Sequence, residues 1–110
     1  MKKIILNQTN NEDIIELSMS ANESDKISTS IIEIQICGLL TGQIIKLYRK
    51  KYPNDINSQW SPIGIPTQDP DYIIYQFIKD GVYSIGGYDR IGQIKFVLEN
   101  SNSNNVYLYI

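Results

Sequence analysis

A clear alternation of apolar and polar side chains between residues 27 and 37 is the feature that most constrains the fold of this chain. Ile32, Ile34 and Ile36 fall on one side of an extended backbone, and Glu33 falls on the other. Successive side chains of a β-strand point to opposite faces, so a period of two is typical of a strand with one buried face. The pattern therefore predicts a sheet that covers a hydrophobic core.

Similar patterns predict further strands at residues 15–19, 43–50, 72–79, 82–85, 91–99 and 106–110. Both faces of the segment 72–79 are apolar, which predicts an interior strand, and the Asp80-Gly81 pair after it is typical of a tight turn. All four prolines lie between residues 52 and 70. Because proline cannot donate a ladder hydrogen bond, we expect irregular structure there.

The composition of the apolar residues supports the same fold class. The chain contains 21 Ile and 8 Tyr but a single Ala. β-Branched and aromatic side chains fit a pleated, half-buried surface, whereas a helical bundle with one alanine would be improbable. We predict an all-β, antiparallel β-sandwich, immunoglobulin-like or jelly-roll-like, of about seven to eight short strands.

A chain of 110 residues is long enough for one domain, which we expect to span residues 12–110. Residues 1–11 are predicted to form an N-terminal arm or an edge strand, because the apolar Ile4, Ile5 and Leu6 are followed by an Asn-rich stretch. Such an arm would become ordered on docking. The apolar run is too short for a signal peptide or a membrane span, so we expect synthesis in the cytoplasm.

The residue types disfavour catalysis. The chain has no histidine, which excludes Ser-His-Asp and Cys-His nucleophiles and removes the commonest metal ligand. Asp55 and Asn57 begin a stretch that resembles a calcium loop, but Trp60 stands where that loop requires glycine. They and the carboxylates of residues 69–71 are interpreted as turn residues. We expect no enzymatic activity, no cofactor and no metal.

A basic run, Arg49-Lys50-Lys51, lies between Tyr48 and Tyr52. Basic and aromatic side chains in this pattern bind single-stranded nucleic acid in some proteins. The formal net charge is −2, and a solvated strand end whose lysines discourage edge pairing is the favoured interpretation. Contact with an acidic partner protein is a third alternative.

The C-terminal strand offers a candidate interaction site. Val106 and Leu108 would share one face, and Tyr107 and Tyr109 would share the other. A strand buried on both sides and a strand that displays its tyrosines are both compatible with this pattern. Outward tyrosines would form a docking patch together with Trp60, because tyrosine is enriched at protein interfaces.

The last two thirds of the chain resemble a known class of proteins. Residues 80–91 read DGVYSIGGYDRI and are followed by a predicted strand, an Asn/Ser turn and a terminal VYLY strand. Together with the 43–49 strand and the Trp60-Ser61-Pro62-Ile63 unit, this is similar to the small β-sandwich structural proteins of tailed bacteriophages. The arginine that these proteins carry inside the strand after "G-Y" would here be Arg90, in the turn, or would be replaced by Lys95.

The resemblance implies a non-enzymatic virion protein that decorates the assembled phage head as an auxiliary capsid protein. Its partners would be the major capsid protein or other virion proteins, and it would bind neither nucleic acid nor a membrane. Whether it forms homo-oligomers is an open alternative. The alternative is a receptor- or carbohydrate-binding domain of a tail or head fibre, in which Trp60 and the tyrosines would stack on sugar rings. The candidate interface residues are Trp60, Tyr107, Tyr109, Ile4, Ile5 and Leu6.

The predicted core consists of Ile32, Ile34, Ile36, Ile45, Leu47, Phe77, Ile94 and Phe96, and the single cysteine, Cys37, is expected in or near it.

Overall fold

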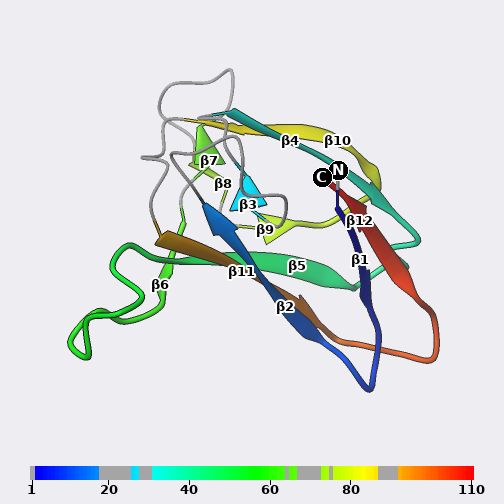
Figure 1. The fold of residues 1–110 in the computed structure, drawn as a ribbon. Helices are drawn as coiled ribbons and strands as arrows, with labels where there is room; N and C mark the ends of the chain where they lie inside the picture. Colours follow the sequence, from blue (N-terminus) through cyan, green and yellow to red (C-terminus); the bar gives the residue numbers. More distant parts are fainter. Residues whose placement is uncertain are drawn as a thin grey trace.

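The computed structural model describes residues 2–17, 26–27, 31–63, 65–66, 73–74, 76–86 and 92–110. In this part of the chain every regular element is a β-strand. The strands form two main sheets that pack face to face (Figure 1). The predicted all-β antiparallel sandwich is therefore confirmed.

The first sheet has four antiparallel strands in the order β1-β12-β4-β10. These are β1 (Lys3–Leu6), β12 (Val106–Tyr109), β4 (Ile31–Cys37) and β10 (Gly81–Gly86). The N-terminal and C-terminal strands lie side by side, and the backbones of Lys2 and Ile110 exchange two hydrogen bonds of 2.8 Å. Residues 3–6 thus form an edge strand of this sheet.

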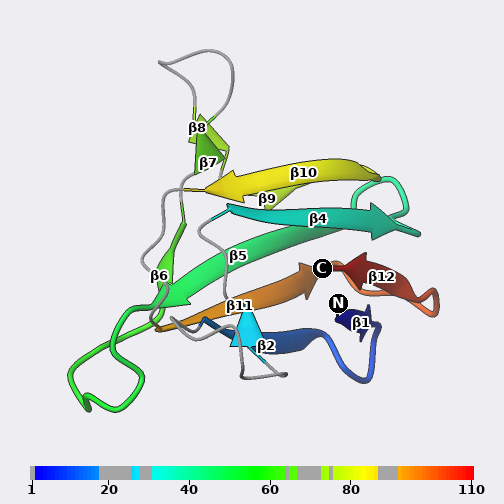
Figure 2. The same ribbon diagram turned by 45° about the horizontal axis from the view of Figure 1, so that its top comes forward.

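The second sheet has the order β3-β2-β11-β5-β6, with β9 also paired to β5. Its strands are β3 (Lys26–Ile27), β2 (Glu12–Leu17), β11 (Gly92–Glu99), β5 (Ile44–Lys50), β6 (Ser61–Pro62) and β9 (Gln76–Phe77). All of these pairings are antiparallel except that of β2 with β3. Two further short strands, β7 (Ile65–Pro66) and β8 (Ile73–Ile74), pair with each other (Figure 2).

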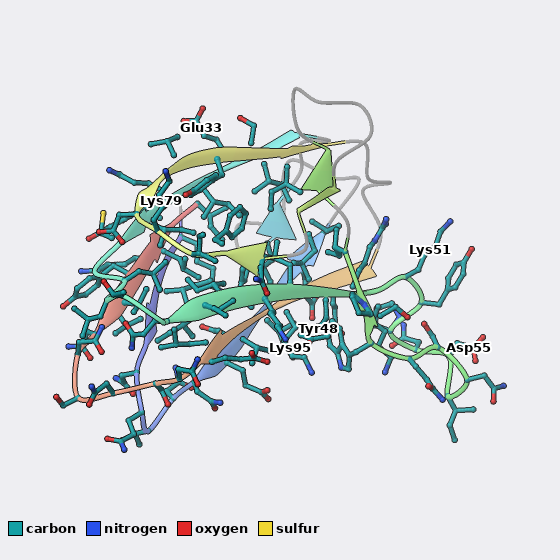
Figure 3. All side chains as sticks on the ribbon, turned by 180° about the vertical axis from the view of Figure 1, so that it is seen from behind. Glu33, Tyr48, Lys51, Asp55, Lys79 and Lys95 are labelled. Atoms are coloured by element: carbon teal, nitrogen blue, oxygen red, sulfur yellow. The ribbon has the colours of Figure 1, made fainter. Side chains whose placement is uncertain are left out.

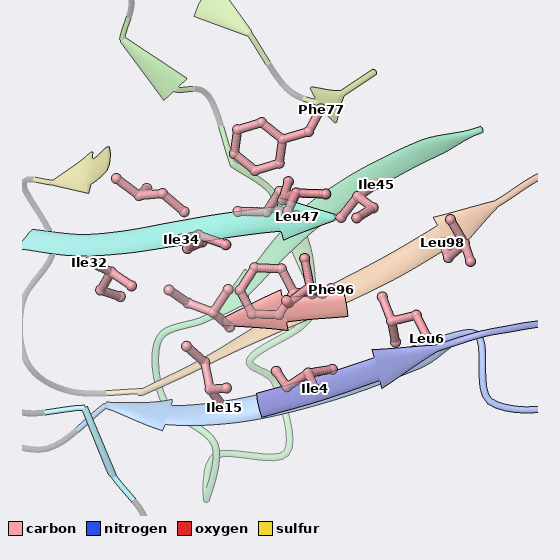
Figure 4. Packing of buried hydrophobic residues seen from close by; sticks show 14 of the residues in the cluster. Ile4, Leu6, Ile15, Ile32, Ile34, Ile45, Leu47, Phe77, Phe96 and Leu98 are labelled. Carbon is pink, nitrogen blue, oxygen red and sulfur yellow. The ribbon is translucent and has the colours of Figure 1, made fainter. Parts of the chain in front are cut away.

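The core fills the space between the two main sheets (Figure 4). All eight predicted core residues are at most 3% exposed, which confirms the inward side of each pattern. Each fully buried aliphatic or aromatic side chain stabilises the fold by about 1.5–3 kcal/mol relative to an exposed one. In the described part of the chain, the core also contains nine buried residues beyond the predicted set: Ile4, Leu6, Ile15, Leu17, Ile63, Ile85, Leu98, Val106 and Leu108.

The predicted interior strand at residues 72–79 is described only at residues 73–74 and 76–79. Of these, Ile73–Ile74 (β8) pairs with β7 and Gln76–Phe77 (β9) pairs with β5, so the two pieces belong to different sheets, and residues 78 and 79 lie outside any strand. The Asp80-Gly81 pair is not a hairpin turn, because β9 and β10 belong to different sheets. Instead, the Asp80 carboxylate accepts hydrogen bonds from the backbone N–H groups of Gly38 (2.9 Å) and Leu39 (2.8 Å) and so joins the start of β10 to the end of β4.

A buried amide, Gln43, joins two turns at one end of the sandwich. Its Oε1 accepts hydrogen bonds from Leu40 N (2.8 Å) and from Asn104 Nδ2 (2.8 Å). Its Nε2 donates to Asn100 O (3.3 Å) and to Asn104 Oδ1 (2.9 Å). All four hydrogen-bonding positions of this amide are therefore used, and the turn that precedes β12 is fixed against the turn that precedes β5.

Candidate functional site

The outer face of the four-stranded sheet displays two stacked tyrosines. Along β12, Val106 and Leu108 point into the core, so Tyr107 and Tyr109 point outward and are half-buried. Their ring centroids are 6.4 Å apart with an angle of 22° between the ring planes. The alternative of a strand buried on both sides is therefore not what the fold contains.

The neighbouring strand β1 adds a cation and an exposed aliphatic side chain. Lys3 pairs with Tyr109 and Ile5 pairs with Tyr107 in the antiparallel register. The Lys3 Nζ lies 5.0 Å from the centroid of the Tyr107 ring and 5.8 Å from that of Tyr109. Such cation–π contacts contribute about 0.5–1 kcal/mol at exposed sites, so they hold the two rings in place. We call Lys3, Ile5, Tyr107 and Tyr109 the tyrosine face.

The tyrosine face continues across the sheet onto β4 and β10. Tyr107 pairs with Cys37 and Tyr109 pairs with Gln35, which in turn pairs with Val82. Cys37 is a free, partly exposed thiol, so it lies on the outer face and not in the core. Val82 is 59% exposed and Ile5 is 41% exposed. The result is a continuous outer surface that combines apolar area with hydroxyl, amide and ammonium groups.

The predicted N-terminal candidates do not all lie on this face. Ile4 is 1% exposed and Leu6 is fully buried, because alternate side chains of β1 point into the core. This corrects the expectation that both residues contribute to a docking surface. Of the three consecutive apolar residues only Ile5 points outward, and the segment is part of the sheet instead of a separate arm.

Trp60 lies on the other sheet and is not part of the tyrosine face. The Lys95 Nζ lies 4.7 Å from the centroid of the Trp60 ring and 5.6 Å from that of Tyr48 (Figure 3 labels Tyr48 and Lys95). Lys95 and Tyr48 pair across β11 and β5 and share the outer face of the six-stranded sheet. The predicted patch that combines Trp60 with Tyr107 and Tyr109 is therefore not formed, since the two groups lie on opposite faces of the sandwich.

The basic run does not form one continuous aromatic strip either. Tyr48 and Lys50 alternate with Arg49 along β5, so the three side chains do not share a face. The Lys51 Nζ lies 5.8 Å from the centroid of the Tyr52 ring, at the start of the loop after β5. This arrangement does not supply a common platform for stacked bases.

The described residues hold no grouping of metal-ligating side chains. Nowhere in that part of the chain do three Asp, Glu or Cys side chains gather into a metal site. The Asp55 Oδ1 accepts a hydrogen bond of 2.9 Å from Asn57 N, which is the local bond of a turn residue. Asp69 and Asp71 lie outside the described residues. No helix in the described part is long and apolar enough to cross a membrane.

A tyrosine outside the tyrosine face has an altered acidity. Tyr83 points inward from β10, with its ring centroid 4.4 Å from that of Phe77. Its hydroxyl donates a hydrogen bond of 2.7 Å to the Lys79 carbonyl. Burial, and secondarily the negative charge of Asp80, raise the pKa of Tyr83 above its usual value of 10.0.

Comparison with models of known protein families, with curated proteins and with solved structures found no match.

Proposed function

We propose that this protein is a non-enzymatic docking module that binds its partner through the tyrosine face. The observation that supports this most directly is the pair of stacked tyrosines, which the fold displays outward under the ammonium of Lys3. Tyrosine combines a large contact area with a polar tip and is enriched among the residues that dominate binding energy. Because the two rings already contact each other and Lys3, less side-chain entropy is lost on binding.

The proposed partner is another virion protein, namely the major capsid protein on the assembled phage head. Support for this comes from the resemblance of residues 35–110 to small sandwich proteins of tailed phages. A small module that displays one outer sheet face suits a repeated site on a closed lattice. Weak binding by each copy of the protein is sufficient there, because neighbouring sites on one shell raise the effective concentration of binding sites.

A carbohydrate-binding domain of a tail or head fibre remains the alternative proposal. Its support is the presence of aromatic rings on both outer faces of the sandwich. The Trp60 ring is already contacted by the Lys95 ammonium, so a sugar would have to displace that cation or use another part of the ring. The Lys3 ammonium likewise contacts both rings of the tyrosine face, so a sugar there would have to share the rings with that cation.

The proposal is tested by binding the protein to assembled heads that bear its native major capsid protein. The variant Tyr107→Ala/Tyr109→Ala removes the two rings, and Tyr52→Ala is the matched control because Tyr52 is 56% exposed on the loop after β5. We expect the double variant to bind at least about tenfold more weakly, since truncating one central interface tyrosine costs about 2 kcal/mol or more. The control is expected to bind like the unmodified protein.

The single cysteine provides an independent readout of the same face. Cys37 is partly exposed and pairs with Tyr107, so a thiol reagent should modify it in the free protein. Docking through the tyrosine face should protect it from that reagent. Undiminished binding of the double variant together with unprotected Cys37 would contradict the proposal. Binding of the protein to a glycan array, with loss in Trp60→Ala, would favour the alternative.

A further inference from the structure

An open cavity of about 530 Å³ lies beside the end of β5. This is the side of the sandwich from which the loop between β5 and β6 extends (Figures 1 and 2). Its polar lining consists of Arg49, Lys51, Ser58, Gln59 and Ser61, and its apolar lining comes from Pro62 and Ile63. Among the described residues that line it, none carries a carboxylate. The described polar lining thus consists of cations, hydroxyls and one amide.

Strand pairing brings two of these side chains to the same place. Arg49 on β5 and Ser61 on β6 are directly opposite each other in the antiparallel register. Side chains opposite each other on paired strands project from the same face of the sheet. The pairing continues beyond β6, because Ile63 N donates a hydrogen bond of 3.0 Å to Leu47 O. This wall of the cavity is thus part of the sheet.

The loop after β5 adds Ser58 and Gln59 to the lining and is folded by two successive turns. Asp55 N donates to Tyr52 O (3.1 Å), and Ser58 N donates to Asp55 O (3.0 Å). The Ser58 Oγ then accepts a hydrogen bond of 3.3 Å from Tyr52 N. Since the oxygen is the acceptor in this bond, the hydroxyl proton remains to be donated to another group. The loop is folded so that Ser58 lies at the cavity as a donor.

We propose that this cavity binds a phosphate group, such as that of a small phosphate monoester. The guanidinium of Arg49 carries five N–H donors and the ammonium of Lys51 carries three. Both side chains also interact with other groups of the chain, and their many N–H groups allow each to bind a phosphate oxygen in addition. With the two hydroxyls and the Gln59 amide, the donors come from two paired strands and from the loop between them.

This donor set suits a phosphate better than a carboxylate. A phosphate monoester has three strong acceptor oxygens and about −1.5 to −2 charges at pH 7, whereas a carboxylate has two oxygens and one charge. Arginine binds such oxyanions through parallel N–H bonds, and lysine adds a compact charge. The volume also falls within the range of about 300–1,000 Å³ that small-molecule sites occupy. The inference is independent of the proposed docking function, because the cavity lies on the six-stranded sheet.

The test is a titration of the full chain with inorganic phosphate, with glucose 6-phosphate and with glucose, followed by ¹H–¹⁵N NMR. The variant Lys51→Glu reverses a charge at the cavity, and Lys50→Glu is its matched control. The Lys50→Glu substitution changes the net charge by the same amount one residue away, but Lys50 is not among the residues that line the cavity. Ser61→Ala removes one donor without a change in charge.

We expect saturable shifts of the amides of Ser58, Gln59 and Ser61 with both phosphate compounds and none with glucose. Lys51→Glu should weaken phosphate binding by at least about tenfold, because it removes a charged donor at the cavity. Lys50→Glu should weaken it by less than about twofold, because an exposed charge away from the phosphate is screened by solvent and salt. Ser61→Ala should weaken it by about threefold to tenfold, the effect of one hydrogen bond. Equal losses in Lys50→Glu and Lys51→Glu, equal shifts with glucose, or no saturation would each overturn the proposal.

Discussion

Replacement of Gln43 by leucine tests whether its hydrogen bonds stabilise the turn that precedes β12, the strand that carries Tyr107 and Tyr109. Gln43 is 3% exposed and makes four hydrogen bonds that involve Leu40, Asn100 and Asn104. Each such bond contributes about 0.5–1.5 kcal/mol, which gives about 2–6 kcal/mol for the set. Water can reach parts of both turns and replace some bonds, so we expect Gln43→Leu to lower the free energy of unfolding by about 2–4 kcal/mol.

The assay is urea unfolding, followed by the fluorescence of the single tryptophan and by far-ultraviolet circular dichroism. The matched control is Gln93→Leu, because Gln93 is a half-buried glutamine on the outer face of β11 with one long hydrogen bond, of 3.4 Å, to Glu16. That substitution should change the free energy of unfolding by no more than about 0.5 kcal/mol. A loss in Gln43→Leu no larger than that in the control would refute the reasoning that the amide joins the two turns.

Three further predictions concern the core, a close backbone approach and the alkaline limb of stability. Phe96→Ala should lower the free energy of unfolding by about 3–5 kcal/mol in urea melts, because the ring is fully buried. Val97 lies on the outer side of the same strand, and Val97→Ala should lower the free energy of unfolding by less than about 1.5 kcal/mol. Equal losses of unfolding free energy in the two variants would contradict this prediction. Gly92→Ala should cost about 2–3 kcal/mol, since Gly92 has a φ of +107° and an added Cβ would lie 2.5 Å from Lys50 O; a neutral result would count against the close approach. The raised pKa of Tyr83 predicts stability that is fully present below pH 10.0 and is lost as the pH rises from there through the folded-state pKa. Urea midpoints measured from pH 8 to 11 should therefore fall less steeply in Tyr83→Phe, and parallel curves would contradict the prediction.

The alternating strands were predictable because alternation directly encodes the two faces of a sheet. Ile32, Ile34 and Ile36 point inward on β4, and Ile94 and Phe96 point inward on β11, as their patterns predicted. Local sequence is sufficient in these cases, since a shift of one residue would expose every apolar side chain.

Elements whose pairing depends on distant residues were predicted less well. Residues 72–79 have apolar side chains on both faces, so the pattern does not say which sheet each part joins. For residues 1–11, which include Ile4 and Leu6, an arm and an edge strand were both left open, because an Asn-rich stretch follows the apolar residues. In the structure this stretch is a turn, in which Asn7 Oδ1 accepts hydrogen bonds from Thr9 N and Asn10 N. Asparagine is a common turn residue for this reason, and the turn leads β1 into the fold.

In the candidate site, too, some features follow from the local sequence and others depend on pairing between distant residues. The outward direction of Tyr107 and Tyr109 follows from the inward direction of their neighbours in β12, which the sequence offered as one of two alternatives. The position of Lys3 over both rings depends on pairing between residues about a hundred positions apart, and no local pattern predicts it. The separation of Trp60 from the tyrosines likewise follows from the strand order of the two sheets.

The central claim, that the tyrosine face is the docking surface, is tested most directly by a cryo-electron-microscopy reconstruction of heads saturated with the protein. We expect one sandwich per repeated lattice site, with β1 and β12 against the shell and Tyr107 and Tyr109 in the contact. A reconstruction in which these strands face the solvent, or in which no ordered sandwich occupies the shell, would contradict it.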